Sequence, residues 1–223
     1  MSNLDETKHV VVVGGAGYLG SVLVRQLLDT GCRVTVFDAL LFGEESVRDL
    51  KVLPDFTLVQ GDLRSISEIS AVLQDGVDAV VLLAALVGEK ACDQDPRATA
   101  DINFLGAKLL AEACKYYGIP RFVFASTDSA YGIQEGIMYE DSPLEPISFY
   151  ARLKMQAEQE ILALADNDFG SLWIPGSCSK NAFNEEFQER LAPFSHVVNE
   201  LKKAQIERKF FLRDPSMGSQ PGT

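Results

Sequence analysis

The sequence has few basic residues and no long apolar run. Lysine and arginine total 20 against 32 acidic residues, and the formal net charge is -12. This charge opposes attraction to nucleic-acid phosphates and anionic lipid surfaces, so we expect neither nucleic acid nor membrane as a partner. No apolar run approaches the roughly 20 residues of a membrane-spanning helix, and residues 1–9 lack the features of a signal peptide. We therefore expect a cytoplasmic protein.

Cysteine, glycine and proline are also limited. Cys32, Cys92, Cys114 and Cys178 lie far apart, without the close pairs typical of zinc sites or redox dithiols. We predict reduced, mostly buried thiols and no metal site. With 17 glycines, 9 prolines and 47% apolar residues, the chain is neither collagen-like nor disordered. Its 223 residues suit one globular core.

From residue 8 onward, short β-branched apolar runs alternate with longer segments of helical period. This order predicts an α/β fold, a doubly wound parallel sheet with helices on both faces. Such sheets bind ligands beyond the carboxyl ends of the strands, where the strand order reverses. The predicted strands are 9–13, 33–37, 56–60, 79–83, 122–126 and 171–174, and the predicted helices are 18–30, 65–73, 98–117 and 148–165.

A glycine cluster lies between the first predicted strand and the first predicted helix. Its spacing fits Gly14-x-x-Gly17-x-x-Gly20 and also Gly15-x-Gly17-x-x-Gly20. Glycine permits a tight turn and a close approach of the backbone to a pyrophosphate, while the helix N-terminus offers free N–H groups. We therefore predict a dinucleotide site formed by Gly14, Gly17, Tyr18, Leu19 and Gly20.

Two carboxylates follow the second and third predicted strands. Asp38 stands 18 residues after Gly20, where it would accept hydrogen bonds from an adenosine ribose and repel a 2′-phosphate. This position favours NAD over NADP. Asp62 is either an adenine-edge contact or a solvated turn carboxylate.

Tyr150 and Lys154 are four residues apart, so a helix places them on one side, one turn from each other. An ammonium near a tyrosine favours the phenolate, which can act as a base, and the lysine can also bind a nicotinamide ribose. The preceding strand ends in the hydroxyls of Ser126, Thr127 and Ser129, one of which could bond the substrate oxygen.

Together these motifs resemble the extended short-chain dehydrogenase/reductase family, in its nucleotide-sugar epimerase/dehydratase branch. The resemblance covers residues 8 to 175 and implies a Rossmann fold. It also implies a bound NAD that takes a hydride from a sugar carbon, commonly C4, to give a keto intermediate that is epimerised or dehydrated and then reduced. The matching motifs are residues 13–20, Asp38, 61–63, 83–85, Asn103, 125–132 and 150–154.

The resemblance also implies roles for individual residues. Tyr150 would be the base or acid, Lys154 its partner, and Thr127 the hydroxyl of the catalytic set. The dehydratases usually read Thr-Asp-Glu where this chain has Thr127, Asp128 and Ser129. The missing second carboxylate favours epimerisation or simple oxidoreduction. The implied catalytic set is Tyr150, Lys154, Thr127, Asp128 and Ser126, and further cofactor contacts are Leu63, Ala84, Ala85 and Asn103.

The chain departs from this family after about residue 175, because members commonly exceed 300 residues and carry a substrate-binding domain there. We expect that domain to be reduced or absent. The predicted organisation is an NAD-binding domain over 1–175, a helical segment over 176–214 and a disordered tail over 215–223. Apolar positions between 183 and 201 predict helices that pack on the sheet or form a partner surface.

Two functions remain open at this point. One is an NAD-dependent oxidoreductase or epimerase acting on a sugar or nucleotide sugar, and the other is an inactive dinucleotide-binding sensor or scaffold. The resemblance further implies a homodimer, paired through the helices over 98–117 and 148–165.

Overall fold

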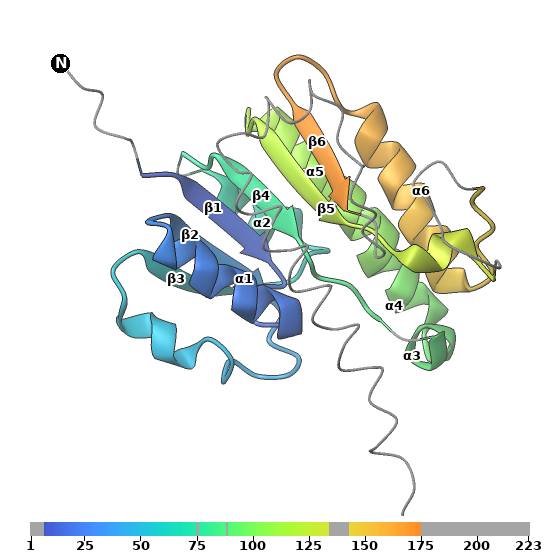
Figure 1. The fold of residues 1–223 in the computed structure, drawn as a ribbon, viewed down its shortest axis with the longest axis horizontal. Coiled ribbons are helices and arrows are strands. Elements are labelled where there is room, and N and C mark those ends of the chain that lie inside the picture. The colour runs from blue at the N-terminus through green and yellow to red at the C-terminus, as the bar shows by residue number, and fades with distance from the viewer. Residues whose placement is uncertain (1–6, 75, 88, 134–142, 175–223) are drawn as a thin grey trace, which may run out of the picture.

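The computed structural model describes residues 7–74, 76–87, 89–133 and 143–174, which form a parallel sheet with helices on both faces (Figure 1). The strand order is β3-β2-β1-β4-β5-β6, so the predicted doubly wound α/β fold is confirmed. The predicted segments 176–214 and 215–223, with Cys178, lie outside the described residues. The strands are β1 His9–Val13, β2 Arg33–Asp38, β3 Phe56–Gln60, β4 Ala79–Leu82, β5 Arg121–Ala125 and β6 Gly170–Ile174.

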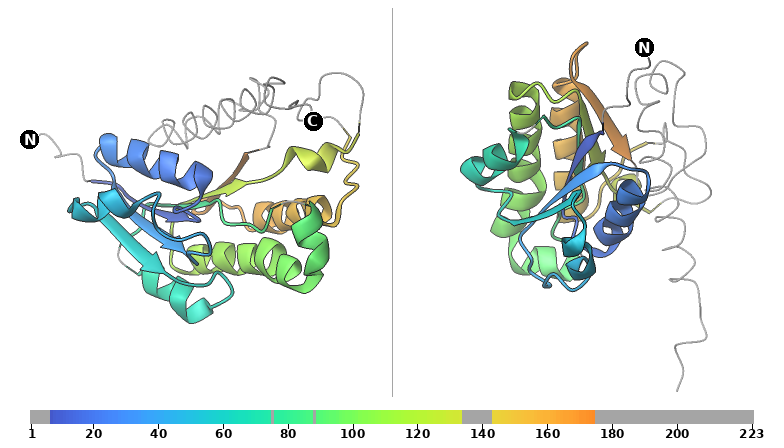
Figure 2. Two further views of the ribbon diagram at one scale, coloured as in Figure 1. Left: turned by 90° about the horizontal axis from the view of Figure 1, so that it is seen from below. Right: turned by 90° about the vertical axis from the view of Figure 1, so that its left-hand side faces the viewer.

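The central strands are apolar at successive positions because both faces of the sheet are covered. Val10 and Val12 of β1 pack on one face with Leu23 of α1. Val11 and Val13 pack on the other face with side chains from α2, α5 and α6. Figure 2 shows α1 on one side of the central strands and these three helices on the opposite side. The α-helices are α1 Tyr18–Asp29, α2 Ile66–Leu73, α3 Glu89–Gln94, α4 Pro96–Ala100, α5 Ala107–Tyr116 and α6 Phe149–Ala163.

The strand order reverses at β1, which pairs with β2 on one side and β4 on the other. The Gly14 N–H donates to the Phe37 carbonyl at 2.9 Å, and the Ala84 N–H donates to the Val13 carbonyl at 2.9 Å. The loops that follow β1, β2 and β4 therefore leave the same edge of the sheet side by side. This edge is where sheets of this kind bind their ligands.

The helix predicted over 98–117 is not one regular α-helix, and in this respect the prediction was wrong. The segment begins at Pro96, with Asp95 as N-cap, and contains a π-helical turn, η2 Asp101–Gly106, between α4 and α5. The wider turn accompanies two tertiary contacts that apolar periodicity cannot report. The Asn103 side chain bonds the backbone of Leu86, and Gly106 lies so close to Leu63 that a Cβ there would stand 3.0 Å from its Cγ.

Short elements in the connections were also not predicted. They are the 3-10 turns η1 Arg48–Val52 and η3 Asp128–Tyr131, together with α3. Cys32, Cys92 and Cys114 are free and buried, which confirms the prediction for these three. Among the described residues, no helix is both long and apolar enough to cross a bilayer.

Candidate functional site

The glycine loop between β1 and α1 contains two glycines that the fold itself requires. Gly14 has φ of 85°, in the left-handed region, and a Cβ on it would lie 2.5 Å from the backbone nitrogen of Ala84. A Cβ on Gly20 would collide with the carbonyl oxygen of Gly14. These two positions hold the loop tightly between β4 and the first turn of α1.

Gly17 is different, because no packing constraint as strong as those at Gly14 and Gly20 requires a glycine at this position. Its backbone is extended, with φ of -75°, and the nearest atom to a Cβ would be the Gly14 carbonyl oxygen at 3.3 Å. Gly17 is also the N-cap of α1, and the first turn of α1 carries no acidic residue. A helix N-terminus without an acidic residue in its first turn, begun by the least crowded glycine of the Gly14-x-x-Gly17-x-x-Gly20 motif, fits the close approach of a pyrophosphate. The adjacent Tyr18 is exposed and Leu19 is half-buried.

Asp38 is held in place by the glycine loop itself. Its carboxylate accepts the N–H of Ala16 at 3.0 Å on one oxygen and the N–H of Leu40 at 2.8 Å on the other. Leu40 adopts a φ of 55°, which is uncommon for a branched side chain. The half-buried carboxylate keeps lone pairs free for the hydroxyls of a ribose. The contact to Ala16 joins the two predicted parts of the cofactor site, and no pattern in the sequence indicates it.

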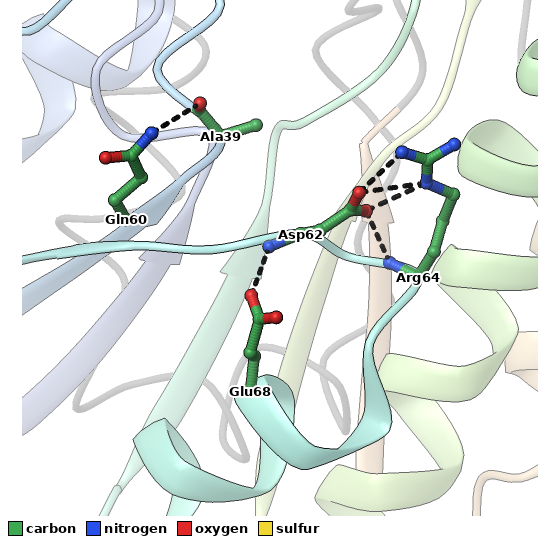
Figure 3. A network of polar contacts seen from close by, with 5 residues as sticks. All are labelled: Ala39, Gln60, Asp62, Arg64 and Glu68. Carbon is green, nitrogen blue, oxygen red and sulfur yellow. Dashed lines mark hydrogen bonds and ion pairs between the residues drawn. The ribbon is translucent and has the colours of Figure 1, made fainter.

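Asp62, in the loop after β3, is engaged by a neighbour that sequence reasoning did not single out. The guanidinium of Arg64 lies against both carboxylate oxygens, with Nε at 2.9 and 3.0 Å, and this pairing lowers the pKa of Asp62 (Figure 3). Glu68 accepts the backbone N–H of Asp62 at 2.8 Å. The carboxylate is thus neither free nor randomly oriented, and its contact with adenine stays a prediction. Leu63 is buried against Gly106.

The loop after β4 is positioned by Asn103. The Asn103 side-chain oxygen accepts the Leu86 N–H at 2.8 Å, and its amide nitrogen donates to the Leu86 carbonyl at 2.8 Å. Asn103 is 1% exposed. It therefore holds the backbone just after Ala84 and Ala85, which are half-buried beside the glycine loop.

The predicted catalytic residues come from the end of β5 and the first turns of α6. Thr127 is buried and its hydroxyl accepts the Ser129 N–H at 3.2 Å, which caps η3. Tyr150 is half-buried in the first turn of α6, and Lys154 follows one turn later. Asp128 begins η3, although its side chain is outside what the structure describes. Helix α6 contacts η3, so both segments meet at the carboxyl end of β5.

Lys154 is a buried cation, 3% exposed, and its Nζ lies 3.8 Å from the ring centroid of Phe124. Burial lowers the pKa of Lys154 to about 7, and the charge of Glu158 opposes this shift. Burial raises the pKa of Glu158, which accepts the Ser126 hydroxyl at 2.6 Å. Sequence reasoning missed Glu158, although its place one turn beyond Lys154 on the same helix face was a signal.

The burial of Lys154 is expected to make the stability of the ligand-free protein depend on pH. Its pKa is lower in the folded state than in the unfolded state, so the unfolded chain binds more protons between pH 7 and 10.5. The free energy of unfolding should therefore rise with pH across this window and lose this dependence below it. Denaturant titration at about pH 7 and 9 should show a gain of up to about 2 kcal/mol that Lys154→Met lacks. Equal gains in both proteins would contradict a titrating buried ammonium.

Comparison with known proteins points to one family. The sequence model of the NAD dependent epimerase/dehydratase family matches residues 10–205. A UDP-glucose 4-epimerase of Lactobacillus helveticus is 33% identical over 96% of this chain and 66% of its own length. A dTDP-glucose 4,6-dehydratase of Streptomyces niveus is 32% identical over 83% of this chain and 57% of its own.

A solved structure shows the same arrangement of strands and helices. The UDP-glucose 4-epimerase of Thermus thermophilus, in complex with NAD, superimposes with a TM-score of 0.65 at 33% identity, over 75% of this chain and 53% of its own. The chain thus spans between about half and two thirds of the length of these relatives. Since the family model matches most of the residues, and the glycine loop, Asp38 and the Tyr150–Lys154 helix stand at one sheet edge, the chain belongs to the NAD dependent epimerase/dehydratase family.

Proposed function

We propose that this chain binds NAD and uses it in a reversible oxidation of a sugar hydroxyl, with Tyr150 as the base. The observation that carries the proposal is the combination of a glycine N-cap, Gly17, at the start of α1 with a buried Lys154 one turn beyond Tyr150. The first feature serves a dinucleotide, and the second serves proton transfer. Relatives named as epimerases and dehydratases, one of them solved with NAD, support the same function.

The residues of the glycine loop fit the cofactor. Gly14, Gly17 and Gly20 would carry the pyrophosphate with the first N–H groups of α1, and Asp38 would accept the ribose hydroxyls. Asp62 would lie at the adenine edge, with its carboxylate oriented by Arg64. Bound NAD would accept a hydride from the sugar carbon and return it later in the cycle.

Side chains of α6 and the end of β5 would move the proton. Tyr150 would take the proton of the sugar hydroxyl as its carbon is oxidised, and return it when the carbonyl is reduced. The ammonium of Lys154 would favour the phenolate of Tyr150 and bond a ribose hydroxyl. The Thr127 hydroxyl, at the carboxyl end of β5, would bond the same substrate oxygen and hold it toward Tyr150.

Asp38 predicts the choice of cofactor. A 2′-phosphate next to this carboxylate would bring like charges together, so NAD should bind at least about tenfold more tightly than NADP. Asp38→Asn keeps the size of the side chain and removes the charge, and should narrow this ratio. Calorimetry with both dinucleotides checks it, with Asp29→Asn, an exposed carboxylate at the end of α1, as control. An unchanged ratio in Asp38→Asn would contradict the role of Asp38.

We propose a nucleotide sugar as substrate and epimerisation as the outcome. The relatives act on UDP- and dTDP-sugars by their names, and Ser129 stands where a dehydratase carries a second carboxylate. The full chain should be incubated with UDP-glucose and the C4 epimer followed by NMR, after mass spectrometry of any dinucleotide released on denaturation. Retained NAD without turnover of any nucleotide sugar would favour the inactive sensor or scaffold instead.

We also propose a homodimer that pairs through α5 and α6. These two helices contact each other, and large apolar side chains remain exposed on or beside them: Leu105, Tyr116 and Leu162. Burial of such side chains against a second copy would remove apolar surface from water. Light scattering should give twice the chain mass of 24.4 kDa, and a monomeric mass would contradict the dimer.

A further inference from the structure

We propose that Glu158 is a positioning residue that keeps Lys154 charged and, through Ser126, fixes the strand end that carries Thr127. This inference rests on the proposed function. Glu158 belongs to neither the glycine loop nor the Tyr150–Lys154 pair, so the proposed function gives it no role.

The first observation is a hydrogen bond between two elements. The Ser126 hydroxyl donates to a carboxylate oxygen of Glu158 at 2.6 Å, and the two residues are 32 positions apart in the sequence. Ser126 immediately precedes Thr127, so the bond ties the third turn of α6 to the end of β5. Short hydrogen bonds to an ionised carboxylate are among the stronger ones in proteins. The bond therefore limits how far Thr127 can move relative to α6.

The second observation is the charge balance around Lys154. The ammonium lies over the Phe124 ring in a nearly dry site, and an aromatic face offsets only part of the cost of burying a cation. Glu158 stands four residues beyond Lys154 on α6, one turn along the same helix face. From there its negative charge raises the pKa of Lys154 against burial. Without that charge, Lys154 would lose its proton at lower pH, and a neutral amine would favour the phenolate of Tyr150 less.

Other charged groups on the elements packed against α6 have different partners. Asp101 of η2 pairs with Arg97 of α4, and Lys108 of α5 pairs with Glu160 on the exposed side of α6. Tyr150 lies on the preceding turn and Tyr131 on η3. Within the described part of the chain, Glu158 is the charged group that acts on the pKa of Lys154.

Two variants separate the charge from the hydrogen bond. Glu158→Gln keeps an oxygen that can accept from Ser126 but removes the negative charge. Ser126→Ala keeps the carboxyl group of Glu158 but removes the bond that lowers its pKa, so it weakens the charge without removing it. Asp168→Asn is the control, since it removes an exposed carboxylate from the loop between α6 and β6. A purely structural role for Glu158 would change the melting temperature without changing the protonation of Lys154.

The first measurement needs neither cofactor nor substrate. The side-chain NMR signal of Lys154, assigned by its loss in Lys154→Met, is titrated with pH in the ligand-free protein. In Glu158→Gln its midpoint should fall by about 1 pH unit. Ser126→Ala should give a smaller fall, because the carboxyl group of Glu158 remains, and Asp168→Asn should keep the midpoint of the unchanged protein. An unchanged midpoint in Glu158→Gln would overturn the proposal.

The second measurement is the pH profile of turnover with NAD and UDP-glucose. The alkaline limb of kcat/KM should move to lower pH in Glu158→Gln by the same amount as the NMR midpoint. In Ser126→Ala the alkaline limb should move less, and kcat should fall because Thr127 is no longer fixed relative to α6. An alkaline limb that stays in place in Glu158→Gln would also overturn the inference. If instead no protein turns over substrate while the NMR midpoint shifts, the proposed function fails and the link between Glu158 and Lys154 stands.

Discussion

Tyr150→Phe is expected to lower the rate of sugar oxidation by about 10²- to 10⁴-fold, the usual contribution of a positioned acid or base. The substitution removes one hydroxyl from a half-buried ring in the first turn of α6 and leaves the helix cap at Ser148 intact. NAD affinity should change little, because Lys154 and the glycine loop remain. Single-turnover reduction of bound NAD by UDP-glucose measures the step directly.

The matching control for Tyr150→Phe is Tyr116→Phe, which removes a hydroxyl from an 85% exposed ring at the end of α5. This variant should oxidise the sugar at the rate of the unchanged protein. If Tyr150→Phe did so too, another group would have to accept the proton and the role of Tyr150 would be refuted. A loss of NAD binding in Tyr150→Phe would instead point to a damaged site.

Gly17→Val is expected to weaken NAD binding by about 10- to 100-fold, which corresponds to the 1–3 kcal/mol that overfilling a close contact costs. Gly17 has an extended backbone that accepts a branched residue, and the one described atom that crowds the new Cβ is the Gly14 carbonyl oxygen at 3.3 Å. The added methyl groups would stand where the pyrophosphate approaches the start of α1. Calorimetric titration with NAD gives the affinity, and thermal unfolding gives the stability.

Gly14→Ala provides the contrast within the same loop. Its φ of 85° and the 2.5 Å approach of a Cβ to the Ala84 nitrogen make it unfavourable in the fold itself, so its melting temperature should fall in the absence of NAD. Gly17→Val should lose less stability than Gly14→Ala, because its φ is negative and its closest Cβ contact, at 3.3 Å, is less severe. The opposite pattern, in which Gly17→Val loses stability but binds NAD as tightly as the unchanged protein, would show that Gly17 is needed for folding and not for NAD binding.

The predicted strands were found within one residue at either end, because a strand buried on both faces is apolar at successive positions. Val10 to Val13 are 0–1% exposed, and few other environments select such a run. Gly31 and Gly118, just beyond α1 and α5, both have a positive φ, which glycine adopts without strain at the end of a helix. Burial on both faces of a sheet and a positive φ each restrict the residue types that fit, so the sequence alone predicts them.

The regions that sequence reasoning missed depend on contacts between distant residues. The π-helical turn accompanies the bond of Asn103 to Leu86, 17 residues away, and apolar periodicity does not predict it. The pairing of Asp62 with Arg64 is local, but whether the two side chains turn toward each other depends on their surroundings. Asp38 was predicted as a ribose acceptor, yet its bond to Ala16 became visible only in the structure.

By itself, the sequence determined the doubly wound sheet and the glycine loop at its switch point, and it singled out Tyr150 and Lys154 as the candidate catalytic pair. Each of these depends on local spacing and on residue type. Only the tertiary structure decided the electrostatic state of the site. Whether Lys154 carries its proton depends on its burial over Phe124 and on the carboxylate of Glu158, and this carboxylate is in turn held by Ser126 from another element. Burial and charge act through space, so residues far apart in the chain set the chemistry of a pair that the sequence places side by side.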